Sequence, residues 1–523
     1  MFKIKNSKLI YLSLILTLIF GLFVKIDAYA TGADDSIKKI TLVSVNDFHG
    51  SIEESGRNVG VAKLADAVAK MKQENRTLFF GSGDLYQGSA PSNLTKGAVV
   101  VDAFKKMKML ASAVGNHEFD WGVDMIPEWS KKGGFDWLAS NIYDKRTGKP
   151  VTWAKPIKVI VVDGVRIGLI GLATPETAYK TIPTNVANLE FKDPATAANE
   201  WAKILKEKNK VDVVVALTHL GAYQDAKTGE ITGEVSDFAN NVENVDGIFC
   251  AHSHQYINGI INGIPVVQGG YNGRALSKMD LYFTNQNKLV SVETRYDELF
   301  ARTDLVENKE VKAVINTYMK KLEPILGEVV GTNVNALSHD TDTDQVTPMG
   351  QVSSMLLAKA GETQIAIFNG GGIRTSLDAG DITMGEMYQI FPFDNTLVTM
   401  KLKGSELKKV IEHGIMSTDF RPGQFYGINV WYDSSKPAGS RISYMELLDG
   451  TPIDMDKEYT VSSIDFLMAG GDLYDFSGAT EVVDTMIPLR DKLVDMIKEM
   501  KVLDFEYQEN LINGPAPAAK KAA

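Results

Sequence analysis

Apolar, strand-like runs that end in polar segments recur through roughly the first 300 residues, and this pattern constrains the fold more than any other feature. From Lys39 to about Arg302 such runs alternate with stretches of helical periodicity, which is typical of α/β proteins. The strand candidates are 40–45, 77–81, 111–114, 165–172, 211–217, 247–251 and 264–268. A helix is predicted over 60–75, where apolar side chains recur at helical spacing at Val61, Leu64, Ala65 and Val68.

The histidines are distributed unevenly along the chain. There are seven, and five of them follow a predicted strand in the company of Asp, Asn or Gly. The segments are NDFHG (46–50), GSGDLYQG (81–88), GNHEFDWG (115–122), THLG (218–221) and AHSH (251–254). Loops after α/β strands collect ligand groups, because the strand holds the backbone rigid while the loop exposes the side chains.

Together these loops supply a mixed set of oxygen and nitrogen ligands. The candidates are Asp47, His49, Asp84, Asn116, His219, His252 and His254. Such a set suits Zn²⁺, Mn²⁺ or Fe²⁺, whereas Ca²⁺ and Mg²⁺ favour all-oxygen shells. Seven ligands are too many for one tetrahedral ion and fit two ions that share a carboxylate about 3.5–4 Å apart. Any one segment alone favours a structural role, such as a capped turn at Asp47, and only the order of all five favours metals.

A second region, from Val329 to about Leu503, has its own glycine-rich turns and strand patterns and is expected to form its own core. A helix predicted over 307–323, and ended by Pro324, connects the two parts. The predicted organisation is a signal peptide at 1–30, domains at 31–305 and 331–510, a linker at 306–330 and a disordered tail at 511–523.

Residues 1–30 predict export. Lysines near the start precede an apolar run from Leu9 to Val24 and the small-residue site Ala28-Tyr29-Ala30. A permanent transmembrane anchor is the alternative, but the apolar run is short for one and the cleavage site favours removal. We therefore expect a periplasmic, cell-envelope or secreted protein that keeps no stable membrane anchor after cleavage.

The charge of the chain argues against a nucleic acid polymer as partner. Without residues 1–30, 51 Lys and Arg stand against 65 Asp and Glu, a net charge of −14. Cys250 is the single cysteine, so the chain forms no internal disulfide, and its apolar neighbours predict an inert core residue.

The five segments resemble, in order, the blocks of the calcineurin-like metallophosphoesterases, in the branch that contains secreted 5′-nucleotidases and UDP-sugar hydrolases. The resemblance extends from about residue 38 to beyond residue 475. It implies an α/β fold of two domains, an N-terminal metallophosphoesterase β-sandwich flanked by helices and a C-terminal α/β substrate-binding domain. It also implies two metal sites with one shared ligand: Asp47, His49 and His254 on one ion, Asn116, His219 and His252 on the other, and Asp84 between them.

Two such ions lower the pKa of a bound water and neutralise phosphoryl oxygens during in-line attack, so the expected chemistry is hydrolysis of a phosphate ester. The resemblance further implies that His117 and Asp120 form a dyad that stabilises the transition state and assists the leaving oxygen. In this dyad the carboxylate orients the imidazole. A packing role for His117 is the alternative.

Motifs of the second region resemble the nucleotide-binding segments of the same family. FNGGGIR (368–374) implies contacts from Asn369 and Arg374, since glycines let the backbone approach a ligand and arginine binds phosphate through two donors. FPFDN (391–395) and DFLMAGGD (465–472) imply that Phe393 and Phe466 stack on the base, a contact that tolerates any base. Two further positions, Asn395 and Asp472, imply polar contacts to base or ribose.

One departure from the family concerns arginine. Many relatives carry one or two more arginines shortly before a Gly-Asn-Leu turn, and the corresponding residues 339–352 contain none. Gln345 stands at one of these positions, and Gln351 replaces the asparagine. A weaker grip on the phosphate is therefore expected.

The leading hypothesis is an exported 5′-nucleotidase that uses two divalent metal ions. A UDP-sugar or dinucleotide pyrophosphatase, or a 2′,3′-cyclic nucleotide phosphodiesterase, would use the same metals with another leaving group. A non-catalytic, secreted nucleotide-binding protein is the alternative from a different class, and the complete ligand set with His117 and Asp120 argues against it. The sequence leaves open the metal, the preferred base and the oligomeric state.

Overall fold

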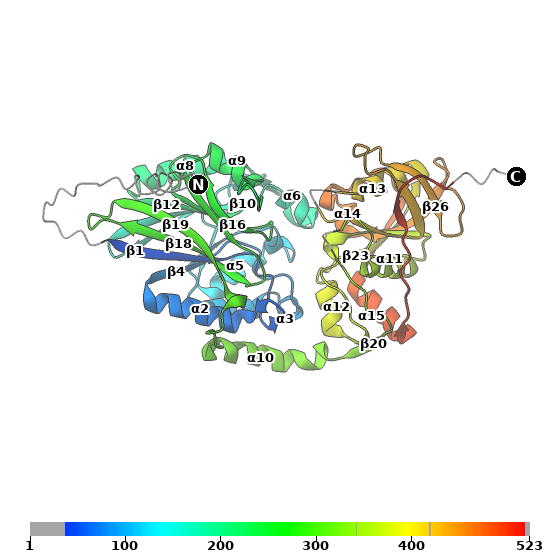
Figure 1. The fold of residues 1–523 in the computed structure, drawn as a ribbon, viewed down its shortest axis with the longest axis horizontal. Coiled ribbons are helices and arrows are strands. Elements are labelled where there is room, and N and C mark those ends of the chain that lie inside the picture. The colour runs from blue at the N-terminus through cyan, green and yellow to red at the C-terminus, as the bar shows by residue number, and fades with distance from the viewer. Residues whose placement is uncertain (1–36, 341–342, 418–419, 518–523) are drawn as a thin grey trace, which may run out of the picture.

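The computed structural model describes residues 37–340, 343–417 and 420–517, so the signal peptide expected over 1–30 lies outside the described residues. Two α/β domains lie side by side, and the long helix α10 (Lys309–Leu326) runs along one side of the molecule to connect them (Figure 1). Among the described helices, none combines the length and the apolar character that crossing a membrane requires.

The N-terminal domain contains two six-stranded sheets. The first has the order β19-β18-β1-β4-β5-β6, and the second has the order β16-β17-β15-β12-β10-β9. The strands of the first sheet are β1 (Lys38–Val45), β4 (Arg76–Gly81), β5 (Ala111–Ala113), β6 (Asp136–Leu138), β18 (Ala275–Phe283) and β19 (Leu289–Glu298). Those of the second are β9 (Ile157–Val162), β10 (Val165–Ala173), β12 (Val213–His219), β15 (Gly247–Phe249), β16 (Tyr256–Ile261) and β17 (Ile264–Gly269). In both sheets the central strands are parallel, and the outer additions β18, β19, β9 and β16 pair antiparallel.

The two sheets pack face to face, which confirms the predicted β-sandwich. One apolar cluster joins them, with Leu42 and Phe80 from the first sheet and Leu169 and Val215 from the second. The outer face of the first sheet packs on α2 (Gly60–Glu74), α4 (Ala98–Lys106) and α5 (Met125–Gly133). The outer face of the second packs on α8 (Pro194–Glu207) and α9 (Glu234–Asn241). Because both faces of each sheet are covered, the central strands are mostly apolar, and the polar residues within them, such as Thr41 and Ser44, are small and buried.

All seven predicted strands exist, with ends that differ from the prediction by at most two residues, and the helix predicted over 60–75 is α2. The prediction omitted the antiparallel strands at the sheet edges. In β19 exposed and half-buried residues alternate, and polar residues such as Lys278 and Asp280 interrupt β18, so neither has the apolar run of a central strand. Cys250 is fully buried, as predicted for a core residue.

The C-terminal domain has its own core, as predicted, with buried residues from Val330 to Leu511. Its main sheet has the order β24-β21-β27-β23-β28. These strands are β21 (Ile365–Asn369), β23 (Thr396–Lys403), β24 (Gly423–Tyr426), β27 (Glu458–Ile464) and β28 (Thr480–Pro488). Two three-stranded sheets complete it, β22-β20-β29 from β20 (Val329–Asn333), β22 (Gly380–Thr383) and β29 (Val502–Leu503), and β26-β25-β30 from β25 (Ile428–Tyr432), β26 (Ile442–Leu447) and β30 (Leu511–Asn513). The helices are α11 (Pro348–Ala360), α12 (Met384–Ile390), α13 (Gly404–Gly414), α14 (Asp465–Met468) and α15 (Leu489–Met500).

The structure corrects two predicted boundaries. Pro324 lies inside α10 and does not end it, because proline removes one hydrogen bond but the next turn still forms, with the Gly327 N–H donating to the Glu323 carbonyl at 2.9 Å. The tail does not begin at residue 511, because Leu511 is buried and β30 pairs in parallel with β25. The small, proline-containing composition begins only at Gly514, and residues 518–523 lie outside the described part of the chain.

Candidate active site

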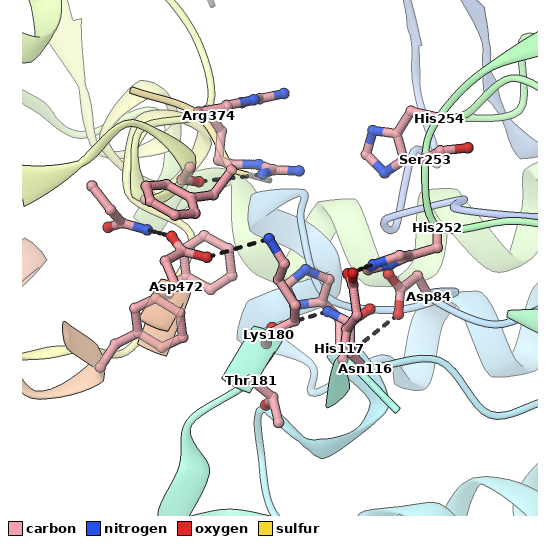
Figure 2. A pocket seen from close by; sticks show the side chains of 18 of the residues that line it. Asp84, Asn116, His117, Lys180, Thr181, His252, Ser253, His254, Arg374 and Asp472 are labelled. Carbon is pink, nitrogen blue, oxygen red and sulfur yellow. Dashed lines mark hydrogen bonds and ion pairs between the residues drawn. The ribbon is translucent and has the colours of Figure 1, made fainter. Parts of the chain in front are cut away.

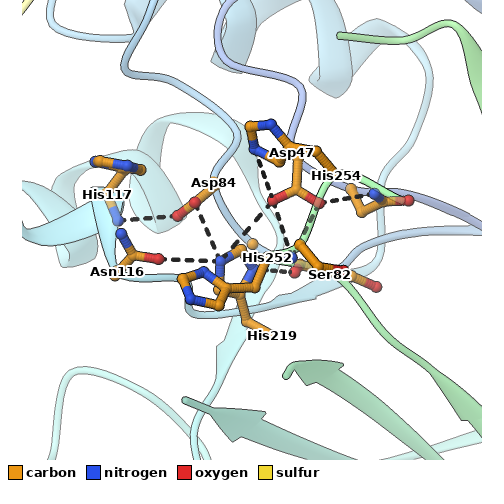
Figure 3. A network of polar contacts seen from close by, with 12 residues as sticks. Asp47, Ser82, Asp84, Asn116, His117, His219, His252 and His254 are labelled. Carbon is orange, nitrogen blue, oxygen red and sulfur yellow. Dashed lines mark hydrogen bonds and ion pairs between the residues drawn. The ribbon is translucent and has the colours of Figure 1, made fainter. Parts of the chain in front are cut away.

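The carboxyl ends of strands from both sheets of the sandwich meet at one edge, and there the structure brings all seven predicted metal ligands together. Asp47 and His49 follow β1, Asp84 follows β4, and Asn116 follows β5. From the second sheet, His219 ends β12, and His252 and His254 follow β15. Figure 3 shows Asp47, Asp84, Asn116, His219, His252 and His254 turned toward one another.

Two groups of ligand atoms form within this cluster. In the first, Asp47, His49 and His254, His49 Nε2 lies 3.1 Å from His254 Nε2, which lies 3.6 Å from Asp47 Oδ1. In the second, Asp84, His219 and His252, His219 Nε2 lies 3.1 Å from Asp84 Oδ2. Atoms bound to one ion at about 2.0–2.2 Å lie roughly 3–3.5 Å apart, so these spacings fit metal coordination.

Asn116 joins the second group. Its Oδ1 lies 3.2 Å from His219 Nε2, and its Nδ2 donates to the Lys180 carbonyl at 3.0 Å. The second contact fixes the amide so that the oxygen faces the ligand cluster. Between the groups, 4.0 Å separates His219 Nε2 from Asp47 Oδ1.

Hydrogen bonds outside the cluster orient the imidazoles. The Nδ1 atoms of His49 and His219 lie 2.9 Å from the Gln87 carbonyl and 2.8 Å from the Ser82 carbonyl. A carbonyl only accepts, so each Nδ1 carries the proton and each Nε2 presents a lone pair to the cluster. His252 is oriented the other way round, because its Nε2 lies 3.0 Å from Glu176 Oε2 and leaves Nδ1 as the nitrogen able to bind an ion.

The backbone of the ligand loops is strained where it presents the side chains. Five of the ligands have a left-handed conformation that non-glycine residues rarely adopt: Asp47 (φ 47°), His49 (φ 47°), Asp84 (φ 53°), His252 (φ 72°) and His254 (φ 58°). The buried carboxylate of Glu118 helps to hold this geometry, since it accepts from the N–H groups of Asp84 (2.8 Å) and Gly115 (2.7 Å). A side chain at Gly115 would place its Cβ 2.2 Å from Asp84 Oδ1, so only glycine fits there.

The charges of the cluster fit divalent cations. Burial raises the pKa of Asp47 to about 6, and it lowers the pKa of His49 to about 3. Burial also opposes the charged form of His219, but Asp84 and Asp47 outweigh it and raise the pKa of His219 to about 10. A bound cation favours ionised carboxylates and neutral imidazoles, and would thereby stabilise both kinds of ligand in the form that binds it.

His117 and Asp120 form the predicted pair beside the cluster. His117 Nδ1 lies 2.8 Å from Asp120 Oδ2, while Asp120 Oδ1 accepts from Thr181 Oγ1 at 2.8 Å. The His117 N–H donates to Asp84 Oδ1 at 2.9 Å, which ties the pair to the ligand loop. With Nδ1 engaged, His117 Nε2 is the nitrogen available to a substrate.

A pocket of about 920 Å³ extends from the cluster into the C-terminal domain. All six predicted substrate residues line it: Asn369, Arg374, Phe393, Asn395, Phe466 and Asp472. Figure 2 shows Arg374 and Asp472 on one side, with His252, His254 and Asp84 on the other. Across the pocket, the rings of His117 and Phe393 have centroids 5.6 Å apart.

Contacts within and between the domains position the substrate residues. Asn369 Nδ2 donates to Asp472 Oδ2 at 2.8 Å, and Lys180 Nζ from the N-terminal domain lies 3.6 Å from Asp472 Oδ1. Arg374 Nη1 donates to the Gly371 carbonyl at 3.2 Å. Asn369 of the glycine turn and Asp472, the last residue of segment 465–472, are therefore joined by a hydrogen bond. Lys180 of the N-terminal domain contacts the same aspartate.

Sequence reasoning missed several residues of the site: Glu118, Glu176, Lys180, Thr181 and Arg421. Glu118 stands inside the GNHEFD segment, and its charge in an otherwise ligand-rich motif was an available signal. The other four carry no local signal, because each meets its partners only through the tertiary fold.

Two families match this chain in succession. The calcineurin-like phosphoesterase family matches residues 40–256, and the 5′-nucleotidase C-terminal domain matches residues 328–478.

Individual relatives cover both domains. Endonuclease YhcR from Bacillus subtilis (strain 168) is 31% identical over 82% of this chain, which spans only 37% of that protein. A 5′-nucleotidase from Vibrio vulnificus (strain CMCP6) is 26% identical over 84% of this chain and 87% of its own length. Among solved structures, that of a 5′-nucleotidase precursor from Thermus thermophilus has a TM-score of 0.78 and 26% identity, and covers 92% of this chain and 100% of that one.

Proposed function

The chain belongs to the family in which a calcineurin-like phosphoesterase domain precedes a 5′-nucleotidase C-terminal domain, and on this premise we propose that it is an exported 5′-nucleotidase. It releases phosphate from nucleoside 5′-monophosphates and uses two divalent metal ions. The observation that carries the proposal is that one pocket is lined both by predicted metal ligands, Asp84, Asn116, His252 and His254, and by all of the predicted nucleotide residues.

Asp47, His49 and His254 would hold one ion, and Asn116, His219 and His252 would hold the other. Asp84 would be the shared ligand; its Oδ2 lies 3.1 Å from His219 Nε2 of the second group, and a carboxylate has a second oxygen to present to another ion. When bound, the ions supply a hydroxide near neutral pH and neutralise phosphoryl oxygens. The donor set favours Zn²⁺, Mn²⁺ or Fe²⁺.

His117 acts on the reacting phosphate and its leaving oxygen through Nε2, while Asp120 fixes the ring through Nδ1. Burial opposes the charge of His117, but Asp120 and Asp84 outweigh it and raise the pKa of His117 above its ordinary value. A protonated imidazole at this position can stabilise negative charge on the phosphoryl group and donate a proton to the departing alkoxide.

In the C-terminal domain, Arg374 binds the phosphate, Phe393 and Phe466 stack on the base, and Asn369, Asn395 and Asp472 make polar contacts. The 5.6 Å spacing of His117 and Phe393 supports this division, because it brings the two halves of the pocket within reach of one nucleotide. Aromatic stacking accepts every base, so the chain should hydrolyse several nucleoside monophosphates.

A substrate panel on metal-stripped and re-metallated protein tests the proposal. Phosphate release from AMP should exceed the hydrolysis of a UDP-sugar, a dinucleotide and 2′,3′-cyclic AMP, and should return with Zn²⁺, Mn²⁺ or Fe²⁺ after stripping. A higher rate with one of the other substrates would change the substrate class while keeping the metal chemistry. Binding of AMP without any hydrolysis would instead identify a nucleotide-binding protein with an inactive metal site.

Export rests on residues 1–30, and N-terminal sequencing of the processed protein tests it. Cleavage after Ala30 is expected. A cell-associated protein that keeps Leu9 to Val24 would show an anchor instead.

A further inference from the structure

The two glutamines that stand where relatives carry polar phosphate or turn residues do not face the pocket. Gln345 Nε2 lies 3.4 Å from the Tyr432 hydroxyl. Gln351 is buried and exchanges two hydrogen bonds with the backbone of Gln508. Neither is among the residues that line the pocket, so neither replaces the missing arginine.

Another segment brings an arginine to the glycine turn. Strands β21 and β24 pair antiparallel with Asn369 opposite Gly423, so the residues just before Gly423 run alongside the residues just after Asn369. Continued by two positions, this register sets Arg421 beside Gly371. The geometry agrees, because a Cβ added to Gly370 would lie 3.1 Å from the Cβ of Arg421 and 2.5 Å from the Pro422 carbonyl oxygen.

Arg374 holds the other side of the same turn. Its Nη1 donates to the Gly371 carbonyl, and its guanidinium carbon lies 5.8 Å from the centre of the Phe393 ring. His339 also contacts this turn, because its Nε2 lies 3.2 Å from the Gly370 carbonyl. Both arginines line the pocket, and they do so from segments far apart in the sequence.

Arg421 and Arg374 both contact the same glycine turn, at Gly370 and at the Gly371 carbonyl. Burial lowers the pKa of Arg374 to about 9, with the charge of Arg421 as the next contribution. Both arginines line the same pocket as the predicted ligands Asp84, His252 and His254. Guanidinium groups bind phosphate through planar, charged donors, so two of them on one pocket can donate to different oxygens of the same phosphate.

We propose that Arg421 is a further substrate-binding residue, which forms with Arg374 an arginine pair that binds the dianionic phosphate of a nucleoside monophosphate. Arg421 thereby supplies the charge that residues 339–352 lack. This inference rests on the proposed function and is an alternative to the expectation from the sequence that the missing arginine weakens phosphate binding.

The test compares Arg421→Gln with Arg421→Lys in the full, metal-loaded protein. Arg146→Gln is the matched control, because Arg146 is exposed, pairs with Asp144 and does not line the pocket. The measured quantities are kcat and KM for AMP, the inhibition constant of inorganic phosphate, and the affinity for the monoanionic diester bis(4-nitrophenyl) phosphate. Thermal unfolding of each variant reports any loss of stability.

Loss of a charge-assisted contact should raise KM for AMP and the inhibition constant of phosphate by about 10- to 100-fold in Arg421→Gln. The diester should lose less affinity because it carries half the charge. Arg421→Lys should recover part of the loss, since it keeps the charge but not the planar donors. Arg146→Gln should match the unmodified protein.

Constants for Arg421→Gln within twofold of the unmodified protein would overturn the inference, as would equal losses for the monoester and the diester. A melting temperature that is lowered in both Arg421→Gln and Arg421→Lys, with no recovery of phosphate affinity in Arg421→Lys, would assign Arg421 a structural role. That result would also overturn the inference. If the unmodified protein releases no phosphate from AMP, the proposed function fails on its own. Calorimetric binding of AMP and inorganic phosphate to the same variants then still decides whether the arginine pair binds phosphate.

Discussion

The metal-ligand cluster and the nucleotide side of the pocket are built in different ways. The ligands Asp47, Asp84 and His219 are at most 2% exposed and stand at the ends of strands within one domain. Arg374, Phe393 and Phe466 are only half-buried and stand on turns and a short helix of the other domain. Two contacts between the domains, Lys180 with Asp472 and His117 with Phe393, complete the nucleotide side of the pocket.

Under the proposed function, this difference would place chemistry and recognition in separate domains. The N-terminal domain fixes the ligand atoms through buried hydrogen bonds and strained loops, as a reaction centre requires. The C-terminal domain supplies contacts that exist for the substrate only when the two domains face each other. Substitutions in the cluster should therefore affect turnover and bound metal, and those across the pocket should affect KM for nucleotides.

The largest effect is expected from Asp84→Ala. The variant should lose turnover and retain one ion or none, because both ions lose a ligand. Elemental analysis of the purified protein measures the metal, and Asp475→Ala, an exposed residue of the C-terminal domain, is the control. Two tightly held ions in Asp84→Ala would contradict the shared-ligand role.

His117→Ala should keep both ions and lose about 10²–10⁴-fold in kcat, the usual contribution of a positioned acid or base. The loss should be greatest for substrates with poor leaving groups, such as AMP. Steady-state kinetics with AMP and with an aryl phosphate, which has a better leaving group, measure this difference. An unchanged kcat for AMP would remove His117 from the mechanism.

Phe393→Ala combined with Phe466→Ala should raise KM for AMP by about 5- to 150-fold, from about 1–3 kcal/mol of stacking per base. The aryl phosphate should be nearly unaffected, since it carries no base. Phe466→Ala alone is the cleaner comparison, because Phe393 also contacts His117. Equal losses for AMP and the aryl phosphate would show that these rings only support the domain.

Thr181→Val should have the smallest effect, a decrease in kcat of about tenfold or less, as expected for one hydrogen bond. The change removes the hydroxyl that donates to Asp120 and keeps the shape of the side chain. If Thr181 positions the His117–Asp120 pair, KM for AMP and the metal content should stay unchanged. A raised KM with normal kcat would place Thr181 in substrate binding instead.

By itself, the sequence determined seven strands of the sandwich and the polar residues that gather at their ends. The central strands are mostly apolar on both faces, so they are visible in the sequence, and each predicted ligand stands within a few residues of a strand end. Parallel strands in one sheet direct their carboxyl ends to the same edge, so the grouping of residues from one sheet follows from local patterns. The packing of the two sheets then brings the two groups together. The edge strands lacked such a signal because one face is exposed or polar residues interrupt them.

Only the tertiary structure decided which charges surround the substrate. Lys180 meets Asp472 across the domain boundary, and Arg421 reaches the glycine turn through the register of β24 on β21. Neither contact has a sequence spacing that could reveal it, because each depends on how distant segments pair and on how the two domains face. The absence of arginine from residues 339–352 was visible in the sequence, but the position of Arg421 beside Arg374 was not, since side-chain charge acts through space and not along the chain.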